Sequence, residues 1–97
     1  MPADFFVYIM TNQRHSVLYT GVTNNLIRRV AQHRAGRQQK DFTCRYRVTK
    51  LIYFEQFRDA YNAITREKQI EGGSRQDKID LINSRNSAWI DLAENSL

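Results

Sequence analysis

Two short β-forming runs, separated by a polar turn and followed directly by a helix start, constrain the fold of this chain most strongly. The runs cover residues 6–10 and 17–23, and both are rich in β-branched and aromatic side chains, as strands are. Residues 11–16 between them are polar and compatible with a turn. We therefore expect the chain to begin with a hairpin that leads straight into a helix.

Each run carries one tyrosine near its middle. Side chains alternate between the two faces of a strand, so Tyr8 is expected to share a face with Met10, and Tyr19 with Gly21. Because Gly21 has no side chain, it leaves that face locally bare. This predicts room for a bulky ligand group beside Tyr19.

A helix is expected after the hairpin, capped by Asn24 or Asn25 and running to about Ala35, where Gly36 ends it. Its apolar arc, expected to face the sheet, consists of Leu26, Ile27, Val30 and Ala31.

At 100° per residue, Arg29 and His33 lie together at the edge of this arc, whereas Arg28 points to solvent. The spacing thus selects Arg29 as the inward-facing cation. A lone histidine at such an edge is more often a packing or capping residue, but its alignment with Arg29 favours a functional role.

The third strand is expected at residues 48–57, where apolar side chains on both faces indicate a central or well-covered strand. A helix then runs from its N-cap Asp59 to about Glu71, and Gly72 and Gly73 close it. A further helix begins at Ser74, and a final turn falls near residues 88–92. The expected fold is α+β, a small three-stranded antiparallel sheet flanked by helices in the order β-β-α-β-α-α. The length of 97 residues suits a single domain over 1–97.

Glu67 interrupts the buried stripe of the helix after the third strand, which otherwise consists of Ala60, Ala63, Ile64 and Ile70. A carboxylate on an apolar face is costly unless a cation compensates it. Either a nearby arginine or a divalent metal would satisfy this requirement.

The tyrosine tripeptides at 6–8 and 19–21 resemble those of the GIY-YIG nuclease superfamily. The first tripeptide, Phe-Val-Tyr, keeps only the tyrosine of the family pattern, which is the residue with chemistry. Arg29 follows Tyr19 by ten residues, His33 follows by four more, and Glu67 lies on the later helix. The likeness covers nearly the whole chain, as in small stand-alone bacterial members of the superfamily.

Positive charge is concentrated in the half of the chain that carries the tyrosines. The net charge is +5, but residues 1–50 hold nine Lys and Arg against two acids, giving +7. A polyanion is expected to lie on this half. A basic solvated surface, an acidic membrane or an acidic partner would suit the same charge.

Residues 34–47 read as a loop in which cations alternate with Phe42 and Tyr46, a composition that grips phosphates and stacks on unpaired bases. The two aromatic side chains would fit equally well in the core. The predicted nucleic-acid contacts are Arg34, Arg37, Lys40, Arg45 and Arg47.

The single cysteine, Cys44, excludes an internal disulfide framework and a multi-cysteine zinc site. No apolar run is long enough to cross a bilayer, and the first residues lack a secretion signal. A soluble, cytoplasmic protein with no membrane partner is therefore expected.

The resemblance implies an endonuclease that hydrolyses DNA phosphodiester bonds. Glu67 would hold one Mg²⁺ or Mn²⁺ and Arg29 would stabilise the transition-state charge. Tyr8 and Tyr19, helped by His33, would orient or deprotonate the water. A tyrosine base requires nearby cations to lower its pKa.

No separate sequence-reading domain is evident, so we expect low base specificity and action on branched, nicked or single-stranded DNA. The resemblance also implies a supporting asparagine near the end of the chain, and both Asn83 and Asn86 lie at plausible positions for it. Two alternatives stay open: a non-catalytic nucleic-acid-binding module on the same fold, and an interaction domain whose tyrosines are core residues.

Overall fold

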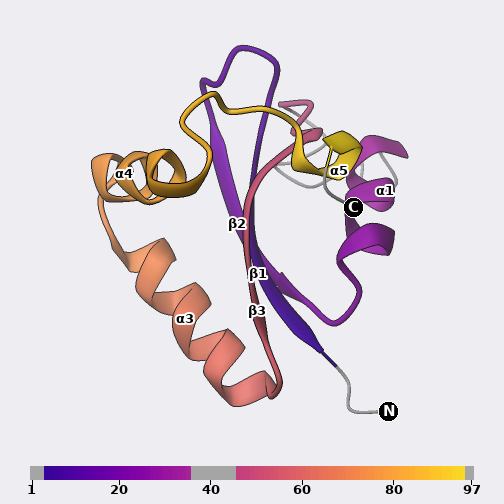
Figure 1. Cartoon of the computed structure of the whole chain (residues 1–97), viewed down its shortest axis with the longest axis vertical. Coiled ribbons are helices and arrows are strands. Elements are labelled where there is room, and N and C mark those ends of the chain that lie inside the picture. The colour runs from indigo at the N-terminus through magenta and orange to yellow at the C-terminus, as the bar shows by residue number, and fades with distance from the viewer. Residues whose placement is uncertain (1–3, 36–45, 96–97) are drawn as a thin grey trace.

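The computed structural model describes residues 4–35 and 46–95, and confirms an α+β fold built on an antiparallel sheet (Figure 1). The elements in chain order are β1 (Phe5–Thr11), β2 (Leu18–Thr23), α1 (Leu26–Ala35), β3 (Lys50–Phe57), α3 (Ala60–Gly72), α4 (Arg75–Arg85) and α5 (Leu92–Asn95). Gly36, Phe42 and Cys44 lie outside the described residues.

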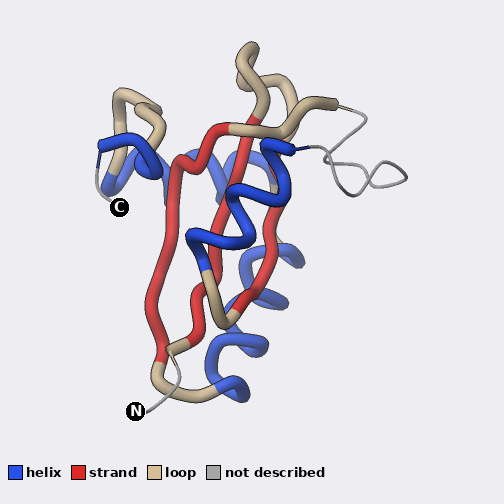
Figure 2. The backbone as a smooth tube through the Cα atoms, turned by 90° about the vertical axis from the view of Figure 1, so that its right-hand side faces the viewer, coloured by secondary structure: helices blue, strands red, loops and turns tan. Residues whose placement is uncertain are grey.

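The three strands have the order β2-β1-β3, so β1 is central and β3 is an edge strand. The sequence predicted that the third strand would be either central or well covered. It is not central, but both of its faces are covered. Its apolar side chains are needed on both faces because α3 and α4 pack on one face and α5 on the other. Figure 2 shows α1 crossing the opposite face of the sheet from α3.

A β-bulge breaks the alternation of side chains along β3. Ile9 pairs with Tyr53, but Met10 pairs with Leu51, so Ile52 is an extra residue on β3. Leu51 consequently lies on the face of Met10, opposite to Tyr53. Strict alternation along residues 48–57 would place Leu51 and Tyr53 on one face, and the bulge separates them.

The sheet separates two hydrophobic cores. On the α3 and α4 side, the buried residues are Val7, Ile9, Ile52, Tyr53, Ala63, Ile70 and Ile82. On the α1 and α5 side, they are Tyr8, Met10, Leu26, Val30, Val48 and Leu51. Tyr8 is therefore a core residue of the α1 side.

Helix α1 is rotated relative to the arc expected from its sequence. Leu26, Val30 and His33 are buried, whereas Ile27 is 66% exposed and Ala31 is exposed. The buried residues recur at i, i+4 and i+7, which is itself a helical stripe, and it carries His33 inward in place of Ile27. Asn25 is the N-cap, because its side-chain oxygen accepts a hydrogen bond from the Arg28 backbone N–H.

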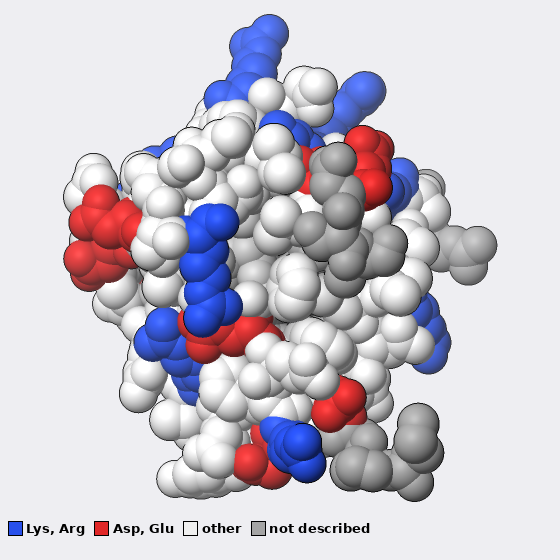
Figure 3. All heavy atoms as spheres, viewed as in Figure 1, with Lys and Arg blue, Asp and Glu red and all other residues white. Residues whose placement is uncertain are grey.

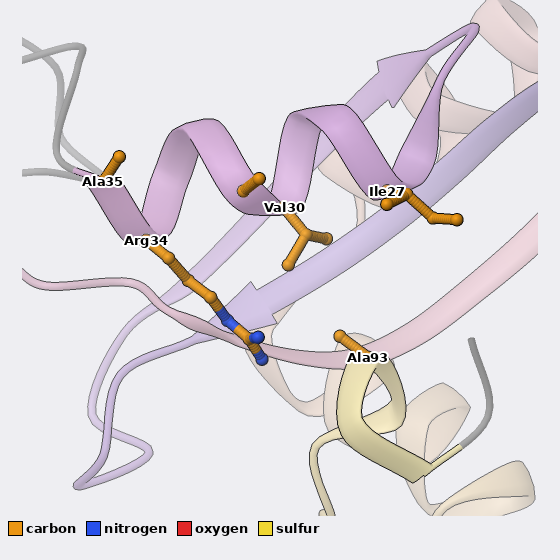
Figure 4. Close-up of a pocket in the computed structure, with 6 residues that line it drawn as sticks. Ile27, Val30, Arg34, Ala35 and Ala93 are labelled. Carbon is orange, nitrogen blue, oxygen red and sulfur yellow. The ribbon is translucent and has the colours of Figure 1, made fainter.

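The exposed side of α1 borders a shallow groove of about 520 Å³ between α1 and α5. Figure 4 shows Ile27, Val30 and Arg34 of α1 lining this groove, with Ala93 of α5 opposite them.

The caps of α3 and α4 form as expected. The Asp59 side chain accepts from the Asn62 N–H, and Gly73 is the C-cap of α3. Ser74 and Asp77 form a reciprocal capping box at the start of α4. In the part of the chain that the structure describes, every helix is too short or too polar to cross a membrane.

Candidate functional site

Tyr8, Tyr19 and His33 form a cluster on the α1 side of the sheet. They come from β1, β2 and α1 respectively, and their ring centroids are 6.2 Å (Tyr8–Tyr19), 6.0 Å (Tyr8–His33) and 5.3 Å (Tyr19–His33) apart. The Tyr8 hydroxyl is 3.2 Å from Nε2 of His33, a buried hydrogen bond. The structure thus brings together three of the four residues that the sequence assigned to catalysis.

The space beside Tyr19 is filled from within the protein. A Cβ atom on Gly21 would lie 2.5 Å from the Tyr8 hydroxyl oxygen and 2.6 Å from Cζ of the same ring. The prediction that Gly21 leaves room for a ligand group is therefore wrong. The glycine is required by the close approach of the Tyr8 ring.

The pKa of Tyr8 is raised above its ordinary value of 10, chiefly because the side chain is buried. Interaction with Tyr19 and the negative charge of Glu67 raise the pKa further, and the positive charge of Arg29 opposes them. The expected lowering by nearby cations is thus outweighed by burial, and Tyr8 retains its proton at neutral pH.

Arg29 is half-buried and its charge acts on Tyr8, whereas Arg28 is exposed. Both residues line a small polar cleft of about 110 Å³ at the start of α1, together with Thr23, Asn24, Asn25 and Gln32. The structure agrees with the inward orientation that the spacing gave to Arg29.

Glu67 lies on the other side of the sheet, in α3, which packs beside the edge strand β2. It lines a cleft of about 360 Å³ together with Leu18, Tyr19, Thr20 and Glu71. Across the ranges 4–35 and 46–95, no lysine or arginine forms an ion pair with Glu67. The neighbouring Arg66 instead pairs with Glu55 of β3 at 3.0 Å.

The residues of this cleft fit a hard divalent cation that keeps part of its water shell. The Thr20 hydroxyl oxygen is buried and has no hydrogen-bond partner among the described residues. Within those residues, no three His, Cys, Asp or Glu side chains gather as a full ligand cage. One or two carboxylates with bound waters are the usual set for Mg²⁺.

Thr20 and Glu71 are two cleft residues that were not singled out from the sequence. Glu71 follows Glu67 by four residues, so the helical repeat places it on the same side of α3. Thr20 follows Tyr19 directly and therefore faces the opposite side of β2, toward α3. The helical repeat and the alternation along β2 identify both residues once α3 is known to lie beside β2.

Two of the predicted nucleic-acid contacts lie in the described part of the chain. Arg34 forms an ion pair with Asp91, and its Nε donates to the Thr49 carbonyl at 3.1 Å, so it ties α1 to the segments around β3 and α5. Arg47 is exposed and has a positive φ of 54°. Arg37, Lys40 and Arg45 fall outside the described residues.

Both candidate asparagines are engaged in holding the C-terminal segment. Asn86 is buried, and its side-chain amide donates to the carbonyls of Ile52 and Ile90 at 2.9 and 3.0 Å. The Asn83 side chain accepts from Nε1 of Trp89 at 2.7 Å. These contacts assign a structural role to both residues.

Comparison with known proteins gives one consistent family. The family sequence model of the GIY-YIG catalytic domain matches residues 4–80 of this chain. A UPF0213 protein of Staphylococcus haemolyticus is 40% identical over 83 residues, which cover 86% of this chain and 99% of that protein. A UPF0213 protein of Clostridium perfringens is 40% identical over 80 residues, covering 82% of this chain and 84% of that protein.

A similar fold is found in a solved structure. The solution NMR structure of a UPF0213 protein from Bacillus halodurans aligns with a TM-score of 0.56 and 22% identity, covering 96% of this chain and 97% of that one. The GIY-YIG domain is of a nuclease type, acts on nucleic acid and generally uses divalent metals. The match over residues 4–80 and the relatives at 40% identity show that this chain belongs to the GIY-YIG family.

Proposed function

We propose that this protein is a divalent-metal-dependent endonuclease that hydrolyses DNA phosphodiester bonds, directed by DNA structure and with low base specificity. The observation that supports this is the convergence of Tyr19 and Glu67 in one cleft at the β2 edge. The Tyr8–His33 hydrogen bond and Arg29 lie on the α1 side of the same strand. These side chains match the chemical requirements of phosphodiester hydrolysis.

Each group has one task in this proposal. Glu67, with the Thr20 hydroxyl nearby, would hold Mg²⁺ or Mn²⁺, and the bound ion supplies positive charge to the phosphate and the leaving oxygen. The Arg29 guanidinium stabilises the negative charge that builds on the phosphate. Tyr19, which lines the cleft, orients the attacking water through its hydroxyl.

The raised pKa of Tyr8 favours proton relay over a standing phenolate. A phenol that keeps its proton can donate to Nε2 of His33 while accepting a proton from the attacking water. The proton then ends on the imidazole, which carries a positive charge in place of a negative charge on the Tyr8 oxygen. His33 is the final proton acceptor in this scheme.

The test is a cleavage assay on single-stranded, duplex, flap and branched DNA, with Mg²⁺, Mn²⁺ or EDTA. Glu67→Gln removes a carboxylate without changing shape, so cleavage should stop while DNA binding persists. Glu94→Gln is the matched control. Glu94 is exposed on α5, so this substitution makes the same chemical change away from the cleft.

Metal-dependent cleavage that is lost in Glu67→Gln and kept in Glu94→Gln would support the proposal. Equal activity of Glu67→Gln and the unaltered protein would refute the role of Glu67. Binding of DNA without cleavage across the whole panel would favour the non-catalytic nucleic-acid-binding module instead.

A further inference from the structure

An exposed apolar strip lies on α3 beside the cleft of Glu67. Tyr61 is 77% exposed, the largest exposed fraction among the large hydrophobic side chains of the described residues, and Ile64 is 42% exposed. The expectation that Ile64 belongs to the buried stripe of this helix is therefore wrong, because only Ala63 and Ile70 of α3 are buried. Residues three apart on a helix are neighbours, so Tyr61 and Ile64 form one continuous surface. These two side chains present a small apolar surface that a ligand could cover.

The strip leads directly to Glu67. Ile64 precedes Glu67 by three residues, so these two side chains are also neighbours on the helix surface. At a rise of 1.5 Å per residue, Tyr61 lies about 9 Å along the helix axis from Glu67. Six residues at 100° each also turn Tyr61 about 120° around the helix from Glu67, so a ligand that contacts both residues would follow the surface of the helix.

The rotation of α3 places this strip on the side away from β3. Arg66 points toward β3, where it pairs with Glu55. Ile64 lies about 160° around the helix from Arg66, on the side that carries Glu67 toward β2 and its cleft. Ile64 thus lies about 60° around the helix from Glu67, and Tyr61 lies a further 60° around, pointing away from the sheet.

Cations flank the strip. Lys68 follows Tyr61 by seven residues, two turns further along the same line, and Arg58 directly precedes the N-cap of α3; both are exposed. On the face of the molecule seen in Figure 3, lysine and arginine side chains are interspersed with acidic ones and do not form one broad basic surface. An exposed aromatic ring between isolated cations suits unpaired nucleotides better than the two phosphate rows of a duplex.

We propose that Tyr61, supported by Ile64, stacks on an unpaired base of the substrate, next to the phosphate that lies in the Glu67 cleft. The proposed endonuclease then acts where at least one nucleotide is unpaired, because the faces of paired bases are covered by their neighbours in a duplex. This inference rests on the proposed function for the position of the phosphate. Stacking on an aromatic ring is tolerant of sequence, which agrees with low base specificity.

The experiment measures binding rather than cleavage, in the Glu67→Gln background, with fluorescein-labelled oligothymidine of eight nucleotides and a hairpin duplex. Tyr61→Ala should weaken oligothymidine binding about tenfold or more, the loss of one stacked base, and leave duplex binding unchanged. Tyr61→Phe keeps the ring and should bind within about twofold of its parent. Ile90→Ala removes an apolar side chain that is 46% exposed on the α4–α5 connection, and serves as the control.

Equal weakening on oligothymidine and duplex, or no weakening on either, would overturn the inference. Unchanged oligothymidine binding with a Tyr61-dependent change in sedimentation would assign the strip to a second copy of the chain, and would also overturn it. A tenfold loss of oligothymidine affinity in Tyr61→Ala, with duplex affinity unchanged, would support the inference even if the unaltered protein cleaves no DNA. In that case only the catalytic proposal fails. Cleavage by the unaltered protein with Tyr61→Ala binding like its parent would overturn this inference alone.

Discussion

Tyr8 of β1 and Gly21 of β2 are directly paired across the two strands, and the Tyr8 ring covers the position that a side chain on residue 21 would occupy. The hydroxyl of this ring also meets His33 of α1 at 3.2 Å. One glycine therefore sets the position of the candidate proton relay.

Gly21→Ala should displace the Tyr8 ring, because its Cβ would come within 2.9 Å of three ring and hydroxyl atoms. Overpacking of this kind costs about 1–3 kcal/mol of unfolding free energy, and we expect cleavage to fall with it. Urea denaturation and a cleavage assay would measure both effects. Gly72→Ala is the matched control, since nothing lies within 4 Å of its Cβ, and it should leave stability and activity unchanged or slightly improved.

Arg29→Ala should lower the cleavage rate about 10²-fold more than Arg28→Ala, because only Arg29 acts on Tyr8 and is half-buried. Arg28 is exposed and should affect mainly DNA affinity. Single-turnover rates at saturating DNA separate the two effects. Equal rate losses in both variants would show that the inward orientation of Arg29 carries no catalytic advantage.

Asn86→Ala should lower the unfolding free energy by about 2 kcal/mol, because it leaves the carbonyls of Ile52 and Ile90 without their side-chain donor. Its cleavage rate per folded molecule should stay unchanged, since Asn86 holds the C-terminal segment to β3. Thermal unfolding and cleavage below the transition would check this. A specific rate that falls while stability holds would instead assign Asn86 to the site.

Glu55→Gln should destabilise the protein by about 1–2 kcal/mol at neutral pH. Burial alone raises the pKa of Glu55, but hydrogen bonds from Arg66 and Tyr53 outweigh it and leave the pKa below its ordinary value of 4.5. The stabilisation is therefore fully present above about pH 4.5, and is lost as pH falls through the lower folded-state value. Urea unfolding of both proteins from pH 7 to pH 3 should give converging free energies. A difference that stays constant over this range would contradict the assignment.

Glu55 also affects the ionisation of Tyr53. Burial of Tyr53 and its hydrogen bond to Glu55 raise the pKa of Tyr53 to about 12. Glu55→Gln should lower this pKa toward 10, which absorbance titration of the phenolate would detect. The guanidinium carbon Cζ of Arg85 lies over the Tyr53 ring, 5.6 Å from its centroid. Tyr53→Phe is the control in the titration, because it removes the absorbance change of this residue alone.

Local sequence signals predicted the order and approximate bounds of the elements. The runs around Tyr8 and Tyr19 are strands, and Asp59 and Ser74 cap the helices that follow them. These features depend on propensity and capping, which act within a few residues. The inward position of Arg29 also followed from the helical repeat.

The errors arose where packing between distant segments decides the outcome. Ile27 is as apolar as Val30, and only the contact of α1 with the sheet selects which of them is buried. The extra residue Ile52 in β3 is defined by its pairing with β1, which no local pattern records. The space at Gly21 is likewise filled by a residue thirteen positions earlier in the chain.

The candidate site depends on an edge strand that is hydrogen-bonded to the sheet on one side only. Tyr19 and Thr20 belong to β2, whose partner in the sheet is β1, while Tyr8 lies in the central strand. Local opening of β2 would disrupt the cleft while β1 and β3 stay paired, so we expect the local stability of the site to be lower than the stability of the whole domain. Hydrogen exchange at the β2 amides would measure this local stability. The local stability determines the temperature at which the site is disrupted while the rest of the fold persists.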